Sequence, residues 1–92
     1  MVLIVKPVYI MNRNEIKEKT IEILSKLREV EKSTIHEDLN LEGDLAMDSL
    51  DMVETIMALE NELSISIPDD EAWRKEMSVG ELINYLENLI NG

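Results

Sequence analysis

Hydrophobic residues recur every three or four positions in three long stretches of the chain, which is the spacing of an amphipathic helix. The first stretch runs from Asn14 to Val30, and charged residues cover its other face. Its apolar positions, which we expect to face a core, are Ile16, Ile23, Leu24, Leu27 and Val30. Asn12 or Asn14 stands where an N-cap is needed, so the pattern predicts a helix over this stretch.

The second and third stretches follow the same rule. The second begins at Ser49 and ends near Leu63, and its apolar stripe is Met52, Ile56, Leu59 and Leu63. Asp51, Glu54, Thr55, Asn61 and Glu62 take most of its polar face. The third starts where Ser78 and Glu81 have capping-box spacing, and its apolar face is Val79, Leu82, Ile83, Leu86, Leu89 and Ile90. We therefore predict two further helices.

Between these helices the pattern breaks twice. Residues 31–47 carry turn formers, yet Ile35, Leu39, Leu41 and Leu45 are spaced to pin a long loop onto a core. After Leu63 a short extended piece holds Ile65 and Ile67, and Pro68 opens a brief helical turn. The predicted fold is all-α, a small four-helix bundle of three longer helices and one short helix.

A second apolar row lies beside the core stripe of the middle helix and adjoins Ser49. It consists of Leu50, Val53 and Met57. So wide an apolar arc means either that the helix packs on two sides or that one row is offered to a visiting protein. Both interpretations remain open at this point.

Composition narrows the class of function. The 92 residues carry 20 acids against 9 bases, a formal net charge of −11, and 45% of the chain is hydrophobic. So acidic a chain repels nucleic acid and anionic membranes and attracts partners with a basic patch. There is no cysteine, and the single histidine, His36, cannot build a relay or a histidine metal site alone.

The N-terminal residues 1–11 are apolar but too short to span a bilayer, and they lack the features of a signal peptide. Nothing else is apolar enough to cross a membrane, so we expect a soluble, cytoplasmic protein. Nothing in the sequence demands more than a monomer.

The stretch DLAMDSLDMVETI, residues 44–56, holds the strongest candidate for chemistry. Asp48 is a natural N-cap, which puts Ser49 on the first turn, where unpaired N–H groups and the helix dipole favour an anion. The surrounding acids would repel a free phosphate. The two observations agree if a phosphate is covalently attached to Ser49 and the acids attract a basic partner enzyme.

The segment DLAMDSLDMVETIMALENEL, followed by SISIPDDEA, resembles the acyl carrier proteins around their Asp-Ser-Leu attachment motif. The resemblance covers roughly residues 13–90 and includes the long loop, the size and the acidity. It implies that Ser49 carries 4′-phosphopantetheine donated by coenzyme A, with Asp48 and Leu50 flanking the attachment site. Acyl groups would be held as thioesters on the thiol of that arm, and the protein itself would not be an enzyme.

The resemblance also implies a set of docking residues and partners. The partners would be a phosphopantetheinyl transferase and the acyl-chain synthases and transferases that bear basic patches, with no nucleic acid and no membrane insertion. The residues that would face them are Asp44, Asp48, Leu50, Asp51, Val53, Glu54, Met57 and Glu60.

Several positions differ from the usual family pattern. Ala46-Met47 stands where Gly-Ala or Gly-Phe is usual, Leu41 replaces a Phe, and Leu63-Ser64 replaces a Phe-Gly pair. A carrier specialised for polyketide, aminoacyl or modified-lipid synthesis is therefore an alternative to a fatty-acid carrier. A bundle of the same fold that serves as an interaction module without the arm is another.

Two further expectations concern the ends of the resemblance. Residues 1–12 are an N-terminal tail or extension to a helical domain over 13–92, and Met11-Asn12-Arg13 looks like a natural start, so we expect residues 1–10 to have no function of their own. Residues 38–49 partly match a calcium-binding loop, but its last position, normally a bidentate Glu, is Ser49. We expect no metal site.

Overall fold

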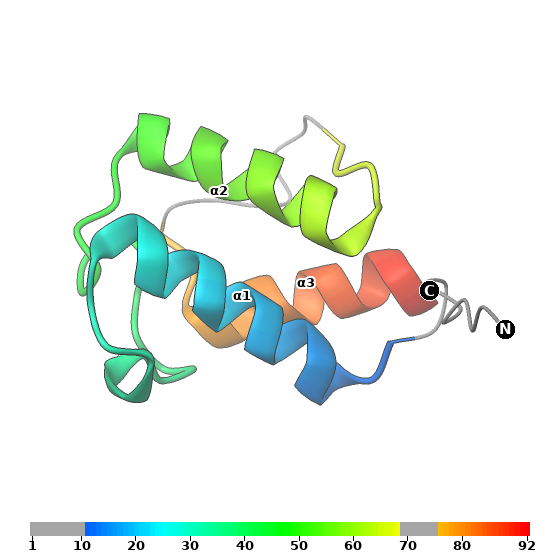
Figure 1. Ribbon diagram of the computed structural model, residues 1–92, viewed down its shortest axis with the longest axis horizontal. Coiled ribbons are helices and arrows are strands. Elements are labelled where there is room, and N and C mark those ends of the chain that lie inside the picture. The colour runs from blue at the N-terminus through cyan, green and yellow to red at the C-terminus, as the bar shows by residue number, and fades with distance from the viewer. Residues whose placement is uncertain (1–10, 69–75) are drawn as a thin grey trace, which may run out of the picture.

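The structure is a computed structural model that describes residues 11–68 and 76–92. Over these residues it contains three α-helices and no strand: α1 (Arg13–Arg28), α2 (Ser49–Leu63) and α3 (Val79–Asn91), with a short 3-10 turn, η1, at Lys32–Thr34. Helix α1 packs against both α2 and α3. Figure 1 shows α2 running above α1, and α3 crossing behind α1 in this view. The all-α prediction is confirmed. The fourth, short helix expected after Pro68 falls mainly on residues outside the described ranges.

Helix α1 begins with a reciprocal cap. The Asn12 side chain accepts a hydrogen bond from the Glu15 N–H, and the Glu15 carboxylate accepts one from the Asn12 N–H. Ile16 and Leu24 are fully buried, while Ile23 and Leu27 pack against the core from partly exposed positions. These positions confirm the predicted apolar face.

The C-terminal end of α1 differs from the prediction. Glu29 adopts a left-handed conformation (φ 54°) and its N–H donates to the Ser25 carbonyl, so the helix ends at Arg28. Val30 therefore lies beyond the helix and is 38% exposed. Its assignment to the apolar face was wrong, because periodicity does not reveal where a non-glycine residue enters the left-handed region.

Helix α2 buries its predicted stripe of Met52, Ile56, Leu59 and Leu63. Thr55, which we placed on the polar face, is also buried, as is Thr20 in α1. Each hydroxyl donates to the carbonyl one turn earlier, to Asp51 and Ile16 respectively, at 2.8 Å. A threonine whose hydroxyl is bonded within its own helix can be buried without leaving an unpaired polar group.

Helix α3 starts at the predicted capping box, in which Ser78 and Glu81 exchange hydrogen bonds with each other's backbone N–H. Val79, Leu82, Ile83 and Leu86 are buried, while Leu89 and Ile90 are partly buried at the edge of the core. All three helices thus begin with the same device, and none of the three relies on glycine or proline there.

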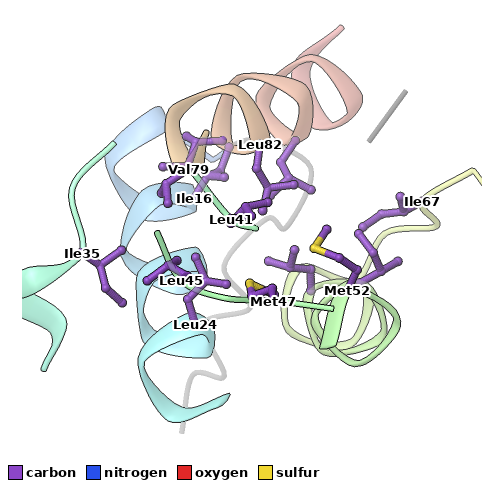
Figure 2. Close-up of a cluster of buried hydrophobic side chains, with 14 of the residues drawn as sticks. Ile16, Leu24, Ile35, Leu41, Leu45, Met47, Met52, Ile67, Val79 and Leu82 are labelled. Carbon is purple, nitrogen blue, oxygen red and sulfur yellow. The ribbon is translucent and has the colours of Figure 1, made fainter. Parts of the chain in front are cut away.

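The long loop before α2 supplies much of the core. Ile35, Leu41 and Leu45 are buried as predicted, and Leu39 is partly buried. Met47, which the pattern did not single out, is also buried. Figure 2 shows Ile35, Leu41, Leu45 and Met47 pointing into the cluster formed by the helices. The loop is therefore a fixed part of the bundle, and it delivers the chain to Ser49 from a set position.

Backbone hydrogen bonds tie this loop to the start of α3. The N–H of Val79 donates to the Leu39 carbonyl and that of Gly80 to the Glu37 carbonyl, both at 2.8 Å. A Cβ on residue 80 would lie 3.1 Å from the Glu37 carbonyl oxygen, so glycine permits this close approach.

Candidate functional site

Ser49 is the first residue of α2 and is exposed to solvent. Within residues 11–68 and 76–92, its hydroxyl makes no hydrogen bond. The sequence predicted a serine on the first turn, and the structure confirms that placement. Its Oγ atom is therefore accessible at the positive end of a helix.

Asp48 and Asp51 form a capping box around Ser49. The Asp48 Oδ1 atom accepts a hydrogen bond from the Asp51 N–H at 2.8 Å, and Asp51 Oδ2 accepts one from the Asp48 N–H at 3.1 Å. These bonds, chiefly the one from the Asp51 backbone, hold the pKa of Asp48 below its ordinary value. Asp48 therefore stays ionised and bonded to the helix start.

Asp51 also pairs with a cation from α1. Arg28 Nη1 lies 3.2 Å from Asp51 Oδ2, and the Asp51 side chain is only 19% exposed. The ion pair joins the last turn of α1 to the first turn of α2. The sequence alone did not identify Arg28, because 23 residues separate the partners and no local spacing signals the contact.

The acids predicted for docking divide into two groups. Asp44 accepts a hydrogen bond from the Asn40 N–H at 2.7 Å, and Glu60 accepts one from the Ile67 N–H at 2.8 Å. Asp48 and Asp51 are bonded as described above. Glu54 is exposed and makes no hydrogen bond or ion pair with any described residue, which leaves its carboxylate available to a partner.

The second apolar row of α2 is exposed. Leu50, Val53 and Met57 keep 64%, 47% and 63% of their surfaces accessible. The interpretation that these three residues pack inside the protein is wrong, because among the described residues α2 contributes its Met52 side to the core. They form, with Glu54 between them, an apolar strip beside Ser49 that we call the α2 strip.

Two departures from the family pattern coincide with left-handed backbone. Ala46 has φ 55°, two residues before the capping box, and Ser64 has φ 54° at the C-cap of α2. Glycine tolerates this region at no steric cost, which explains why the family usually has it at both positions. In this chain, both positions place a side chain in the left-handed region.

Residues 38–49 are held by hydrogen bonds within the segment and by others to residues near the start of α3. Asn40 Oδ1 accepts hydrogen bonds from the N–H groups of Glu42 and Gly43 at 3.1 and 2.7 Å, and its Nδ2 atom donates to the Glu76 carbonyl. The described part of the chain contains no group of three or more His, Asp or Glu side chains placed to hold a metal ion. Among the same residues, no helix is long and apolar enough to cross a membrane.

Comparison with known proteins gives a consistent result. The family described as the phosphopantetheine attachment site matches residues 18–86. The acyl carrier protein of Lactobacillus acidophilus is 40% identical over 78 residues, which cover 85% of this chain and 96% of that protein. The acyl carrier protein of Prochlorococcus marinus is 40% identical over 77 residues, or 84% of this chain and 95% of that protein. The acyl carrier protein of Guillardia theta is 48% identical over 62 residues, which cover 67% of this chain and 76% of that protein.

Proposed function

Because this chain belongs to the phosphopantetheine-attachment family and is an acyl carrier protein that bears this prosthetic group, we propose that the Oγ atom of Ser49 is the attachment point. Ser49 is exposed, opens α2 and has a hydroxyl with no competing hydrogen bond among the described residues. When bound, the group supplies a thiol that holds acyl chains as thioesters, a function that a chain without cysteine cannot provide itself.

The residues around Ser49 fit a phosphodiester despite their negative charge. The Asp48 carboxylate is bonded to the N-terminal N–H of α2, and the Asp51 carboxylate is bonded to Arg28. Each charge is thus partly compensated by a fixed partner, which reduces its repulsion of a phosphate on the neighbouring oxygen. The same bonds hold Ser49 in place while it reacts. Leu50 follows Ser49 directly in α2, so it flanks the attachment point on the side opposite Asp48 in the sequence.

We further propose that the α2 strip is the surface that partner enzymes recognise. Leu50, Val53 and Met57 offer apolar contact area next to the reacting hydroxyl, and Glu54 offers a free carboxylate in the middle of it. Asp44, Asp48, Asp51 and Glu60 add to the negative potential that steers a basic surface toward the strip, although their side chains are bonded internally.

The partners that fit this surface are a phosphopantetheinyl transferase and the synthases and transferases of fatty-acid or related synthesis, each with a basic patch. The chain would act as a cytoplasmic monomer that presents acyl groups and catalyses no step itself.

The observation that carries the proposal is the free, exposed Ser49 hydroxyl at the capped start of α2. Incubation with coenzyme A and a promiscuous phosphopantetheinyl transferase should raise the intact mass by one phosphopantetheine, and Ser49→Ala should abolish the gain. Ser66→Ala, which removes another exposed serine, is the matched control and should be modified normally. An unmodified wild-type chain would instead favour an interaction module without the arm.

A further inference from the structure

A groove between α1 and α2 adjoins the α2 strip and shares Glu54 with it. Its volume is about 380 Å³. Both helices contribute to its lining, which consists of Glu22, Ile23, Lys26, Leu27, Glu54, Ala58, Asn61 and Glu62. Helices α1 and α2 lie side by side over this region (Figure 1).

The lining combines an aliphatic surface with carboxylates on both sides. Ile23 and Leu27 of α1 and Ala58 of α2 supply the aliphatic part. Glu22 stands on the α1 side, and Glu54 and Glu62 stand on the α2 side. Lys26 is the one cation in the lining, and Glu62 is partly compensated by Lys19 at 3.5 Å. Glu22 and Glu54 make no ion pair with any described residue, so one uncompensated carboxylate flanks the groove from each helix.

This combination fits a long cationic side chain. The methylene stem of an arginine can lie on aliphatic surface while its guanidinium bonds to carboxylates, and its planar fork can meet two of them at once. A fully apolar occupant such as an acyl chain would leave Glu22, Glu54 and Lys26 beside hydrocarbon, which costs free energy.

We propose that this groove receives an arginine side chain of the phosphopantetheinyl transferase, so that the partner's footprint extends from the α2 strip onto α1. Glu54 belongs to both surfaces, which makes the groove continuous with the strip. The inference rests on the proposed function, because it concerns the enzyme that modifies Ser49. It adds a contribution from α1, and in particular from Glu22, that the attachment motif itself does not contain.

The test measures the KM of the transferase for the carrier. Glu22→Lys should raise KM by about three- to tenfold at low salt, since it replaces an attractive contact with a repulsive one. Glu18→Lys is the matched control, because it makes the same charge change one turn earlier on α1, outside the groove. It should reproduce only the general electrostatic effect, about twofold or less. Equal KM values for the two variants would overturn the inference.

Filling the groove without changing charge gives an independent measurement. Ala58→Leu should raise KM by about threefold or more because the added carbons occupy the space of the arginine stem. Melting temperatures of all variants should stay near that of the wild type. An unchanged KM for Ala58→Leu would also overturn the inference.

A binding experiment covers the case of a variant that folds poorly. Titrating the Ser49→Ala chain with transferase should shift the backbone amide resonances of Ile23 and Leu27 together with those of the α2 strip. Shifts confined to α2 would place the footprint outside the groove and overturn the inference. Failure of this inference can be told apart from failure of the proposed function, because the proposed function fails only if wild-type Ser49 is not modified at all.

Discussion

At the scale of single residues, the structure separates acids that look alike in the sequence. Asp51 and Glu54 both follow Ser49 closely and both match docking positions of the family. Asp51 is bonded to the Asp48 N–H and to Arg28, whereas Glu54 has no partner among the described residues. Their substitution should therefore have different consequences.

Glu54→Lys should raise the KM of the transferase severalfold at low ionic strength and leave thermal stability nearly unchanged. Asp51→Ala should lower the free energy of unfolding by about 1 kcal/mol, because it removes half of the capping box and the partner of Arg28. Steady-state kinetics and chemical denaturation of the two variants, with Glu54→Ala as the stability control, measure these effects. A KM for Glu54→Lys equal to that of the wild type would remove Glu54 from the docking surface.

At the scale of the helices, the ends of α1 and α2 depend on left-handed residues that are not glycine. Glu29 and Ser64 terminate the helices, and Ala46 turns the chain just before α2. A side chain in this conformation crowds the following carbonyl, so these positions hold strain that glycine would relieve.

Ala46→Gly should stabilise the protein by about 1 kcal/mol, since relief of the left-handed strain exceeds the entropy gained by the unfolded chain. Ala58→Gly, in the middle of α2, is the contrasting control and should destabilise it by about 1 kcal/mol. Urea titration monitored by circular dichroism measures both. Destabilisation by Ala46→Gly would mean that backbone strain at this turn is negligible.

At the scale of the whole molecule, Glu37 joins the long loop to α1. Its carboxylate accepts two hydrogen bonds from Arg13, at 2.6 and 3.0 Å, and lies 3.0 Å from Lys17 Nζ. Arg13 in turn donates to Asn84 of α3 at 3.1 and 3.0 Å. The hydrogen bonds that Glu37 accepts, first from Arg13 and then from Lys17, lower its pKa from the ordinary 4.5 to about 2.

Glu37→Gln should lower stability near neutral pH by about 1 kcal/mol, a figure reduced by the exposure of these groups to solvent and salt. A carboxyl group whose pKa is lower in the folded protein than in the unfolded chain stabilises the fold at pH values above the unfolded-state pKa. This stabilisation is lost as the pH falls through the folded-state pKa. The difference between wild type and variant should therefore be full above about pH 5 and vanish near pH 2. Asp38→Asn, which removes a neighbouring charge, is the control variant in the same denaturation series.

Residues 1–10 can be tested at the same scale. Met11 packs against the core, and its carbonyl accepts a hydrogen bond from Asn91 Nδ2 at 3.1 Å. A chain that starts at Met11 keeps this contact and the Asn12 cap, so it should retain its helical circular dichroism and be modified at the same rate. Loss of either would show that the extension contributes to the folded carrier.

The three helices, their caps and most of the core could be predicted because they rest on local information. The spacing of Met52, Ile56 and Leu59 fixes one buried face whatever lies opposite, and Ser78 with Glu81 defines a helix start over four residues. The Asp-Ser-Leu motif likewise indicated the first turn of a helix and a phosphate-bearing serine. Composition fixed the sign of the protein's own net charge.

Contacts between distant residues decided the rest. Which acids remain free depends on Arg28, Asn40 and the Ile67 backbone, and the side of α2 left exposed depends on where α1 packs. Hydrogen bonds and burial depend on three-dimensional neighbours that residue spacing does not encode. The sequence therefore specified the helices and the position of Ser49 at the start of α2, while tertiary packing decided which side chains near it are exposed and which acids are bonded.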